Sequence, residues 1–195
     1  MRLRGDKLEK LAEKGGVSLD QLAQAVERTG LSGDRAKSAV KNWMMGRDHP
    51  RCKAADIAKL AAAVGVQTKD IARFVSRVNQ HRGSPRKAKL LMDLVRGKSV
   101  DEALNLLTFT TKRAAVNIKK ALNAAIADAE QAEADVTQLF VVESRVGDGG
   151  MFKRFQPKDR GRAHPIEKRF SNIVIGVEER AANCLLYTSP SPRDS

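Results

Sequence analysis

Two expected helices begin with lysine and arginine residues, where helices ordinarily carry acidic ones. Residues 84–89 read Ser-Pro-Arg-Lys-Ala-Lys, and Lys112-Arg113 stand at the start of a long helical pattern. Peptide dipoles place partial positive charge at a helix N-terminus, so cations there are unfavourable unless an anion joins them. A phosphate would pair with these side chains and also accept from the free N–H groups of the helix. The chemistry predicted here is therefore anion binding.

A solvated basic surface is the alternative interpretation, because most surface lysines simply face water. Residues 99–102, Ser-Val-Asp-Glu, follow the usual rule and predict a capping box at the helix between the two basic ones. The rule is thus kept once and broken twice within one segment. For that reason we favour the phosphate over the solvated surface.

A long basic connection is the second feature that could do chemistry. Residues 147–150, Gly-Asp-Gly-Gly, lead into residues 151–169, which contain seven basic and two acidic residues. Paired as a hairpin, arms of about ten residues would project roughly 30 Å. An isolated two-stranded ribbon is marginal in water, so we expect an anionic partner to order it. Phe152 and Phe155 could wedge against RNA bases or pack across the strands, and both roles stay open.

The overall charge points to a polyanionic partner. The chain has 36 Lys and Arg against 23 Asp and Glu, a formal net charge of +13 and a pI near 10.1. No apolar run approaches the roughly 20 residues that a membrane span needs, which favours nucleic acid over a membrane. Cys52 and Cys184 suit neither a disulfide framework nor a metal site, and we expect a cytoplasmic protein.

The sequence does not predict an enzyme. His49, His81 and His164 are scattered along the chain. No nucleophile elbow and no phosphate-cradling glycine loop occurs, and most carboxylates fall on helix faces. We therefore expect no catalytic residues, no cofactor and no metal.

The elements that must position these residues fall into two segments. Residues 1–66 read as short helices separated by glycine, with helix starts expected at Ser18 and Ser32 and a last helix over residues 53–64. Residues 71–182 mix strands expected at 71–78, 136–146 and 170–178 with three helices, the longest from Thr110 or Thr111 to about Gln131. The first segment is all-α, the second is α+β with a hairpin at 147–170, and residues 67–70 are predicted to link them.

The last residues do not resemble the rest of the chain. Residues 184–195 include Cys-Leu-Leu-Tyr-Thr-Ser and Pro-Ser-Pro-Arg-Asp, which read like a translated sequencing adapter. A genuine disordered tail is the alternative, since proline and serine favour disorder. We favour the adapter, which makes residues 183–195 non-native and places the end of the natural sequence near Ala182.

Residues 71–178 resemble the large-subunit ribosomal protein twenty-two family of the bacterial type, whose hairpin lines the nascent-peptide tunnel. The resemblance is carried by residues 84–89, 95–98, 103–107, 113–115 and 153–177 in that order. It implies three helices on a small antiparallel sheet with a long extended hairpin. It also implies a structural constituent of the large subunit that binds large-subunit ribosomal RNA, supports assembly and extends its hairpin to the tunnel wall. The implied partners are this RNA, neighbouring ribosomal proteins and the nascent peptide.

The charge pattern and the resemblance together predict two groups of site residues. Those expected to bind ribosomal RNA are Arg77, Arg82, Ser84, Arg86, Lys87, Lys89, Arg96, Lys98, Lys112, Arg113, Lys153, Arg154, Lys168 and Arg169. Those expected to line the tunnel are Lys158, Asp159, Arg160, Gly161 and Arg162. The chain departs from the family at Asp159, where relatives usually carry a small residue, and at residues 147–150, where they carry a Glu-Gly-Pro type of turn.

Residues 8–66 resemble the helix-turn-helix of the Cro-repressor family. Residues 16–23 match its first helix, residues 32–43 fall at the recognition helix and residues 61–66 match the closing helix, although residues 27–29 lengthen the turn. The residues then expected to contact a groove are Arg35, Lys37, Ser38, Lys41 and Asn42. A DNA-binding regulator is thus the alternative function. We favour instead a helical bundle that packs on RNA or protein and reads no sequence.

Overall fold

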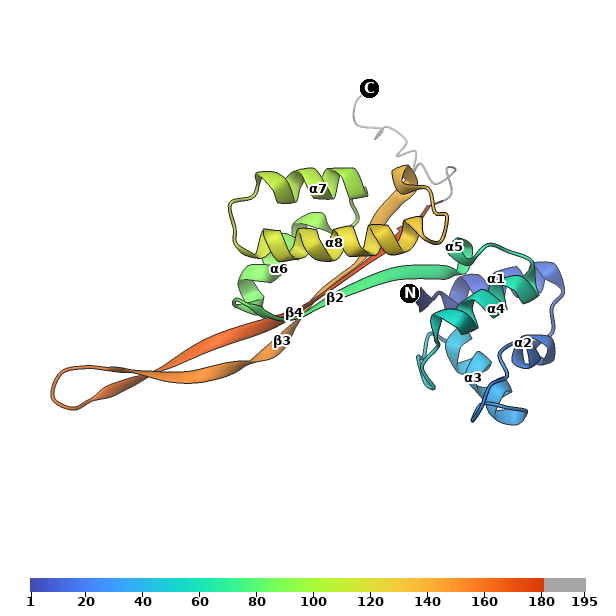
Figure 1. Cartoon of the computed structure of the whole chain (residues 1–195), viewed down its shortest axis with the longest axis horizontal. Helices are drawn as coiled ribbons and strands as arrows, with labels where there is room; N and C mark the ends of the chain where they lie inside the picture. Colours follow the sequence, from blue (N-terminus) through green and yellow to red (C-terminus); the bar gives the residue numbers. More distant parts are fainter. Residues whose placement is uncertain (181–195) are drawn as a thin grey trace, which may run out of the picture.

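The computed structural model describes residues 1–180 and shows an α+β chain, as predicted (Figure 1). The expected adapter tail, residues 183–195, lies outside the described residues. The elements in chain order are β1 Arg2–Leu3, α1 Gly5–Gly15, α2 Leu19–Ala25, α3 Asp34–Met44, α4 Ala54–Val64, α5 Thr68–Ile71, β2 Ala72–Arg82, α6 Pro85–Val95, α7 Val100–Phe109, α8 Ala114–Glu130, a 3-10 turn Val136–Gln138, β3 Leu139–Pro157 and β4 Ala163–Glu179.

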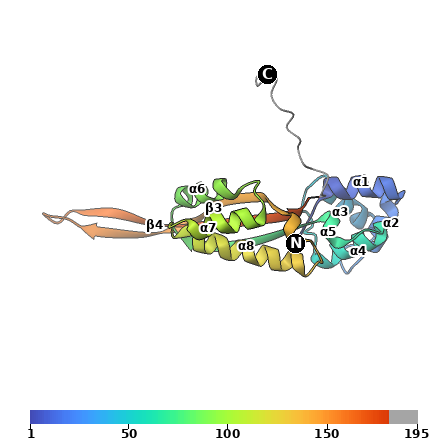
Figure 2. The ribbon, with the colours of Figure 1, turned by 90° about the horizontal axis from the view of Figure 1, so that it is seen from above.

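The sheet is antiparallel with the strand order β1-β2-β4-β3. Phe74, Val177 and Val141 face one another across the three long strands and are fully buried. Because strand side chains alternate between faces, the next row on this face contains Ser144, whose hydroxyl donates to the Met92 carbonyl of α6 at 2.7 Å. The helices α6–α8 therefore cover this face, as Figure 2 shows from above. Figure 1 shows no helix against the opposite face of β2 in the described part.

The apolar stripe expected in the long helix forms the core of this domain. Its members are Ala115, Ile118, Leu122, Ile126 and Ala129, and all are buried. The helix spans 17 residues, which is roughly 25 Å at 1.5 Å per residue. Among residues 1–180, no helix combines the length and the apolar character that crossing a membrane requires.

The starts of three elements differ from those expected. α8 begins at Ala114, because Thr110 is extended and its hydroxyl donates to the Leu106 carbonyl at 2.7 Å, which ends α7 instead. α3 begins at Asp34, not Ser32, with Gly33 before it. Residues 136–138 form a 3-10 turn held by the Asp135 carboxylate, so β3 starts at Leu139.

The expected capping box at α7 is half formed. The Ser99 hydroxyl accepts from the Glu102 N–H at 3.3 Å. The Glu102 carboxylate does not return to Ser99 and lies 3.8 Å from the Lys98 ammonium. An ion pair one turn away therefore replaces the second half of the box.

The hairpin forms as predicted and projects away from the helices (Figure 1). Strands β3 and β4 remain paired from Leu139↔Glu179 to Pro157↔Ala163, which leaves residues 158–162 as the turn. A register shift between Asp148 and Met151, with Gly150 at φ 91°, bends the ribbon at its base. Residues 151–165 are all exposed.

The N-terminal helices join the sheet directly. β1 pairs with β2, and the Arg4 N–H donates to the Ile71 carbonyl at 2.8 Å. Residues 67–70 were expected to be a linker, but residues 68–71 form a helical turn whose Ile71 is fully buried. One continuous hydrophobic core includes both segments. Ile71 in the connection thus packs into the core that both segments share.

Candidate nucleic-acid interface

The two basic helix starts meet at one hollow of about 630 Å³. α6 begins at Pro85 and α8 at Ala114, so their N-termini are 29 residues apart in sequence but adjacent in space. The hollow is lined by His81, Arg82, Gly83, Ser84, Lys87, Ala88, Leu90, Lys112, Arg113 and Ala114. The sequence predicted each basic start separately, and the fold brings them together.

Neither helix start is capped by the protein itself. Ser84 precedes α6 and Arg113 precedes α8, and neither side chain accepts from its helix. Neither first turn contains an acidic residue. The positive ends of two helix dipoles and the nearby cations therefore face the same hollow, which suits an anion.

The cations around the hollow also lack carboxylate partners. Among residues 1–180, no Asp or Glu oxygen lies within 4.0 Å of the cationic groups of Arg82, Arg86, Lys87, Lys89, Lys112 or Arg113. Arg86 and Lys89 are exposed on α6. Within the described residues, therefore, no carboxylate competes with a ligand for these cations.

Other predicted RNA-binding residues lie elsewhere. Arg96 pairs with Asp93 at 2.8 Å and donates to the Ser144 carbonyl, and Lys98 lies near Glu102. Arg77 follows Ser76 on β2 and therefore points to the face opposite α6–α8. The structure thus separates these three residues from the hollow.

His81, which the sequence did not connect with any site, lies in the hollow. Its side chain is buried, at 5% exposure, and Nδ1 lies 2.5 Å from the Asn117 amide nitrogen. Burial and the positive charge of Arg113 lower the pKa of His81 below its ordinary value of 6.5. A neutral ring can accept a hydrogen bond from the Asn117 N–H. His81 therefore forms a fixed, uncharged side of the hollow and does not add another cation.

Glycine at position 83 is required by the packing of this side of the hollow. A Cβ at Gly83 would lie 2.9 Å from the His81 Nε2 atom. Gly83 thus lets the chain turn closely around the imidazole between β2 and α6. Neither the glycine nor the histidine indicates this contact in the sequence alone.

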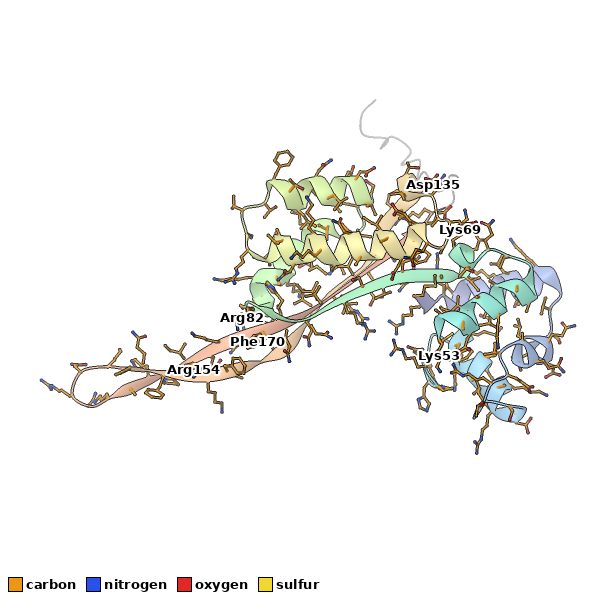
Figure 3. The ribbon with its side chains drawn as sticks, viewed as in Figure 1. Lys53, Lys69, Arg82, Asp135, Arg154 and Phe170 are labelled. Carbon is orange, nitrogen blue, oxygen red and sulfur yellow. The ribbon has the colours of Figure 1, made fainter. Side chains whose placement is uncertain are left out.

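The hairpin continues the basic surface from the hollow. Figure 3 shows Arg82 and Phe170 at the hairpin base and Arg154 farther along it. Lys153, Arg154 and Lys168 are exposed and have no carboxylate within 4.0 Å among residues 1–180. Arg169 differs, because it pairs with Glu167 at 2.7 Å.

The two hairpin phenylalanines have different surroundings. The Phe152 ring packs edge-to-face on Phe170, with centroids 4.9 Å apart. Phe155 is 76% exposed. Cross-strand packing therefore accounts for Phe152, and Phe155 is the one whose ring is available to a base.

The five predicted tip residues form the turn. The Lys158 N–H donates to the Arg162 carbonyl at 2.7 Å, and the Arg162 N–H donates to the Asp159 carbonyl at 3.3 Å. Arg160 and Gly161 adopt positive φ values of 53° and 70°. The backbone closes the turn by itself, so the side chains at positions 158–160 and 162 point into solvent without an ion pair in the described residues.

The groove-contact residues expected on α3 are only partly available. Lys37 pairs with Asp20 at 2.8 Å, and this contact raises the pKa of Lys37. The Asn42 amide donates to the His49 carbonyl at 3.1 Å. Arg35, Ser38 and Lys41 are exposed. The connection between α2 and α3 contains an antiparallel bridge from Arg28 to Leu31, so it is longer than a helix-turn-helix turn.

Comparisons with known proteins match the C-terminal part of the chain. The family model "Ribosomal protein L22p/L17e" matches residues 76–178. The large ribosomal subunit protein uL22 of Clostridium perfringens is 45% identical over 117 residues, which are 60% of this chain and all of the relative. The same protein of Clostridium acetobutylicum is 45% identical over 116 residues, 59% of this chain and 99% of the relative.

The matched segment contains the hollow, the hairpin and most of β2, β3 and β4, whereas β1 and the start of β2 lie in residues 1–75, which precede it. The family model covers more than half of the chain, and the relatives are covered over their full length or nearly so. The chain belongs to the ribosomal protein L22p/L17e family.

Proposed function

We propose that this chain is a structural constituent of the large ribosomal subunit and that it binds large-subunit ribosomal RNA at the hollow between α6 and α8. Its family is one of ribosomal proteins and not of enzymes, and it implies ribosomal RNA and ribosomal proteins as partners. The observation that carries the proposal is the meeting of two uncapped, basic helix starts with no carboxylate near them.

Binding completes an arrangement that is unfavourable in the free protein. Each cation at a helix N-terminus opposes the dipole, an effect of about 0.3–1 kcal/mol at an exposed site. A backbone phosphate in the hollow reverses the sign of this interaction and accepts from the free N–H groups. Each phosphate contact also releases counterions, so affinity falls as salt rises. Recognition follows the shape of the folded RNA, because side chains do not reach the bases in the deep A-form groove.

The hairpin extends this role beyond the globular part. Its residues 151–165 are all exposed and include only three large apolar side chains, Met151, Phe152 and Phe155, which are too few to pack the ribbon on its own domain. RNA phosphates order the arms through Lys153, Arg154 and Lys168. The turn at residues 158–162 then lies at the wall of the nascent-peptide tunnel, with Arg160 and Arg162 facing the peptide.

Sedimentation of cell lysate tests the proposal. A tagged wild-type chain is expected to sediment with large subunits in a sucrose gradient. The variant R86E/K87E should shift toward the top of the gradient, because it reverses two cations at the α6 start. The control K10E/K59E changes two exposed lysines on α1 and α4 and should sediment like the wild type. Wild-type protein found only at the top, or equal losses in both variants, would refute the proposal.

A further inference from the structure

Arginines occupy the face of the sheet that α6–α8 leave open. Arg2 on β1 lies directly opposite Arg73 on β2. Arg77 and Arg145 lie in one row, on either side of Val174. Like charges directly opposite each other destabilise a sheet. This face therefore requires anions to compensate it.

Two buried glutamates compensate only part of the charge. Glu143 is 8% exposed and Glu178 is 5% exposed, and both lie among the arginines. The ion pairs are Arg2–Glu143 at 3.9 Å, Arg4–Glu178 at 2.9 Å, Arg73–Glu143 at 3.4 Å, and closer contacts of Arg73 with Glu178 and of Arg145 with Glu143. Four arginines surround two carboxylates, which leaves an excess of positive charge.

The glutamates also orient the arginines. A guanidinium has five N–H donors, and a single carboxylate engages one or two of them. Arg73 and Arg145 retain side-chain exposures of 29% and 61%. Their remaining donors are thus held in place and face outward, which reduces the entropy lost when a ligand binds.

The N-terminal helices add a basic loop, residues 45–53, next to these arginines. The loop is held by hydrogen bonds to its backbone: the Trp43 indole donates to the Pro50 carbonyl at 2.5 Å and Arg28 donates to the Arg51 carbonyl at 3.2 Å. The side chains of Arg47 and Arg51 are exposed, and neither has a carboxylate within 4.0 Å among residues 1–180. The backbone of the loop is fixed while its cations are available.

Arg2 connects the loop with the sheet. One open hollow of about 410 Å³ is lined by Arg2, Arg73, Arg96 and residues 142–145. A second, smaller hollow is lined by Arg2, Leu3, Trp43, residues 46–48 and Cys52. Because Arg2 lines both hollows, the loop and the open face of the sheet adjoin at this residue, and each hollow also contains one carboxylate, Glu143 in the first and Asp48 in the second. Figure 3 shows Lys53, at the end of the loop, below β2, whereas α8 lies above it.

We propose that Arg2, Arg47, Arg73, Arg77 and Arg145, here called the arginine face, form a second binding surface for large-subunit ribosomal RNA, which the loop at residues 45–53 completes. This inference rests on the proposed function and extends it to a segment that precedes the family match at residue 76. An RNA strand lies along the open side of the sheet and reaches the loop at residues 45–53. Planar guanidinium groups suit phosphates bidentately, and the polyanion neutralises the charge that Glu143 and Glu178 leave.

Filter binding of the full chain to deproteinised bacterial large-subunit ribosomal RNA, measured across salt concentrations, tests this surface. The variant R47E/R77E changes one residue of the loop and one of the sheet, neither of which has an ion pair in the described residues. If two phosphate contacts are lost, the slope of log K against log salt becomes shallower by roughly 1.4–1.8. K10E/K59E is the matched control and should keep the wild-type slope.

Hydroxyl-radical footprinting on the same complexes locates the contact. R47E/R77E should lose protection of one RNA segment and keep the rest, whereas R86E/K87E should lose a different segment. Unchanged slope and footprint for R47E/R77E, with R86E/K87E impaired, would overturn the arginine face and leave the proposed function standing. In another outcome, R47E/R77E keeps the wild-type slope and footprint on RNA but is absent from assembled particles. That outcome would indicate that an acidic protein binds the arginine face, and it would also overturn the proposal. Failure of the wild type to bind this RNA would remove the proposed function itself.

Discussion

The basic residues predicted to bind nucleic acid divide into those paired with a carboxylate of the protein and those without such a partner. Arg96, Arg169 and Lys37 each have a carboxylate partner at 2.7–2.8 Å. Lys87 and Arg113 have none among residues 1–180. The second group lies at helix N-termini, where an unneutralised cation is least favourable. The residues expected to contact phosphate are therefore the cations that have no carboxylate partner in the fold.

The burial of the His81 ring beside Arg113 predicts a pH dependence of stability that can be measured. The pKa of His81 is lowered in the folded protein, so protonation favours the unfolded state. Its contribution to stability is complete above pH 6.5, the ordinary pKa of histidine in the unfolded chain, and is lost as the pH falls from that value toward the lowered pKa. Denaturant titrations should give a lower free energy of unfolding at pH about 5.5 than at about 7.5. H81Q should reduce this difference, and an identical pH dependence in H81Q would contradict the assignment.

The sequence allowed residue types at the site to be predicted but not all of their partners. The excess of cations at residues 84–89 and 112–113 was readable from helix rules, and these residues do line or flank the hollow. Arg96 and Asp93 are only three residues apart in sequence, yet their ion pair depends on where α6 ends. The contacts of His81 with Asn117 and Gly83 depend on the crossing of β2 and α8, which no local pattern encodes.

At the scale of elements, local signals predicted the kinds of helices and strands better than their ends. Apolar spacing identified the buried face of α8, because that face packs on the sheet along its whole length. Its start was displaced because the Thr110 hydroxyl bonds back to α7, a choice that competes with helix capping. The hairpin was predictable from composition, since a long basic connection with few large apolar residues has little with which to pack on its own domain.

The attachment of the N-terminal helices was not readable from the sequence. Two residues of β1 suffice to extend the sheet, and such a short strand has no periodicity. The ion pairs of Arg2 and Arg4 with Glu143 and Glu178 span more than 140 residues of sequence. The contacts that fix the two segments together are long-range, and no local pattern at residues 67–70 indicates them.

Removal of Arg4 tests this attachment. Arg4 and Glu178 have side-chain exposures of 13% and 6%, so the pair is largely desolvated. R4A leaves Glu178 with Arg73 alone, and we expect the free energy of unfolding to fall by about 1–3 kcal/mol. R35A, at an exposed arginine without an ion pair in the described residues, should change it by less than about 0.5 kcal/mol. Equal effects of the two substitutions in urea denaturation would show that the pair does not fix the segment.

At the scale of the whole molecule, basic surfaces lie at three places along an elongated chain. The hairpin occupies one end and the N-terminal helices the other, with α6–α8 on one side of the sheet between them (Figures 1 and 2). The hollow lies near the hairpin base, and the arginine face lies on the open side of the sheet. A net charge of +13 predicted a polyanionic partner but not this distribution, which follows from the fold.

A cryo-electron microscopy map of the native large subunit carrying this chain tests the central claim most directly. The claim is that ribosomal RNA supplies the anion that the starts of α6 and α8 lack. We predict a backbone phosphate in the hollow, within hydrogen-bond distance of Lys87 or Arg113 and of a free N–H at one of the two helix starts. A hollow that opens to solvent in the assembled subunit, or one filled by a carboxylate of a neighbouring protein, would contradict the account.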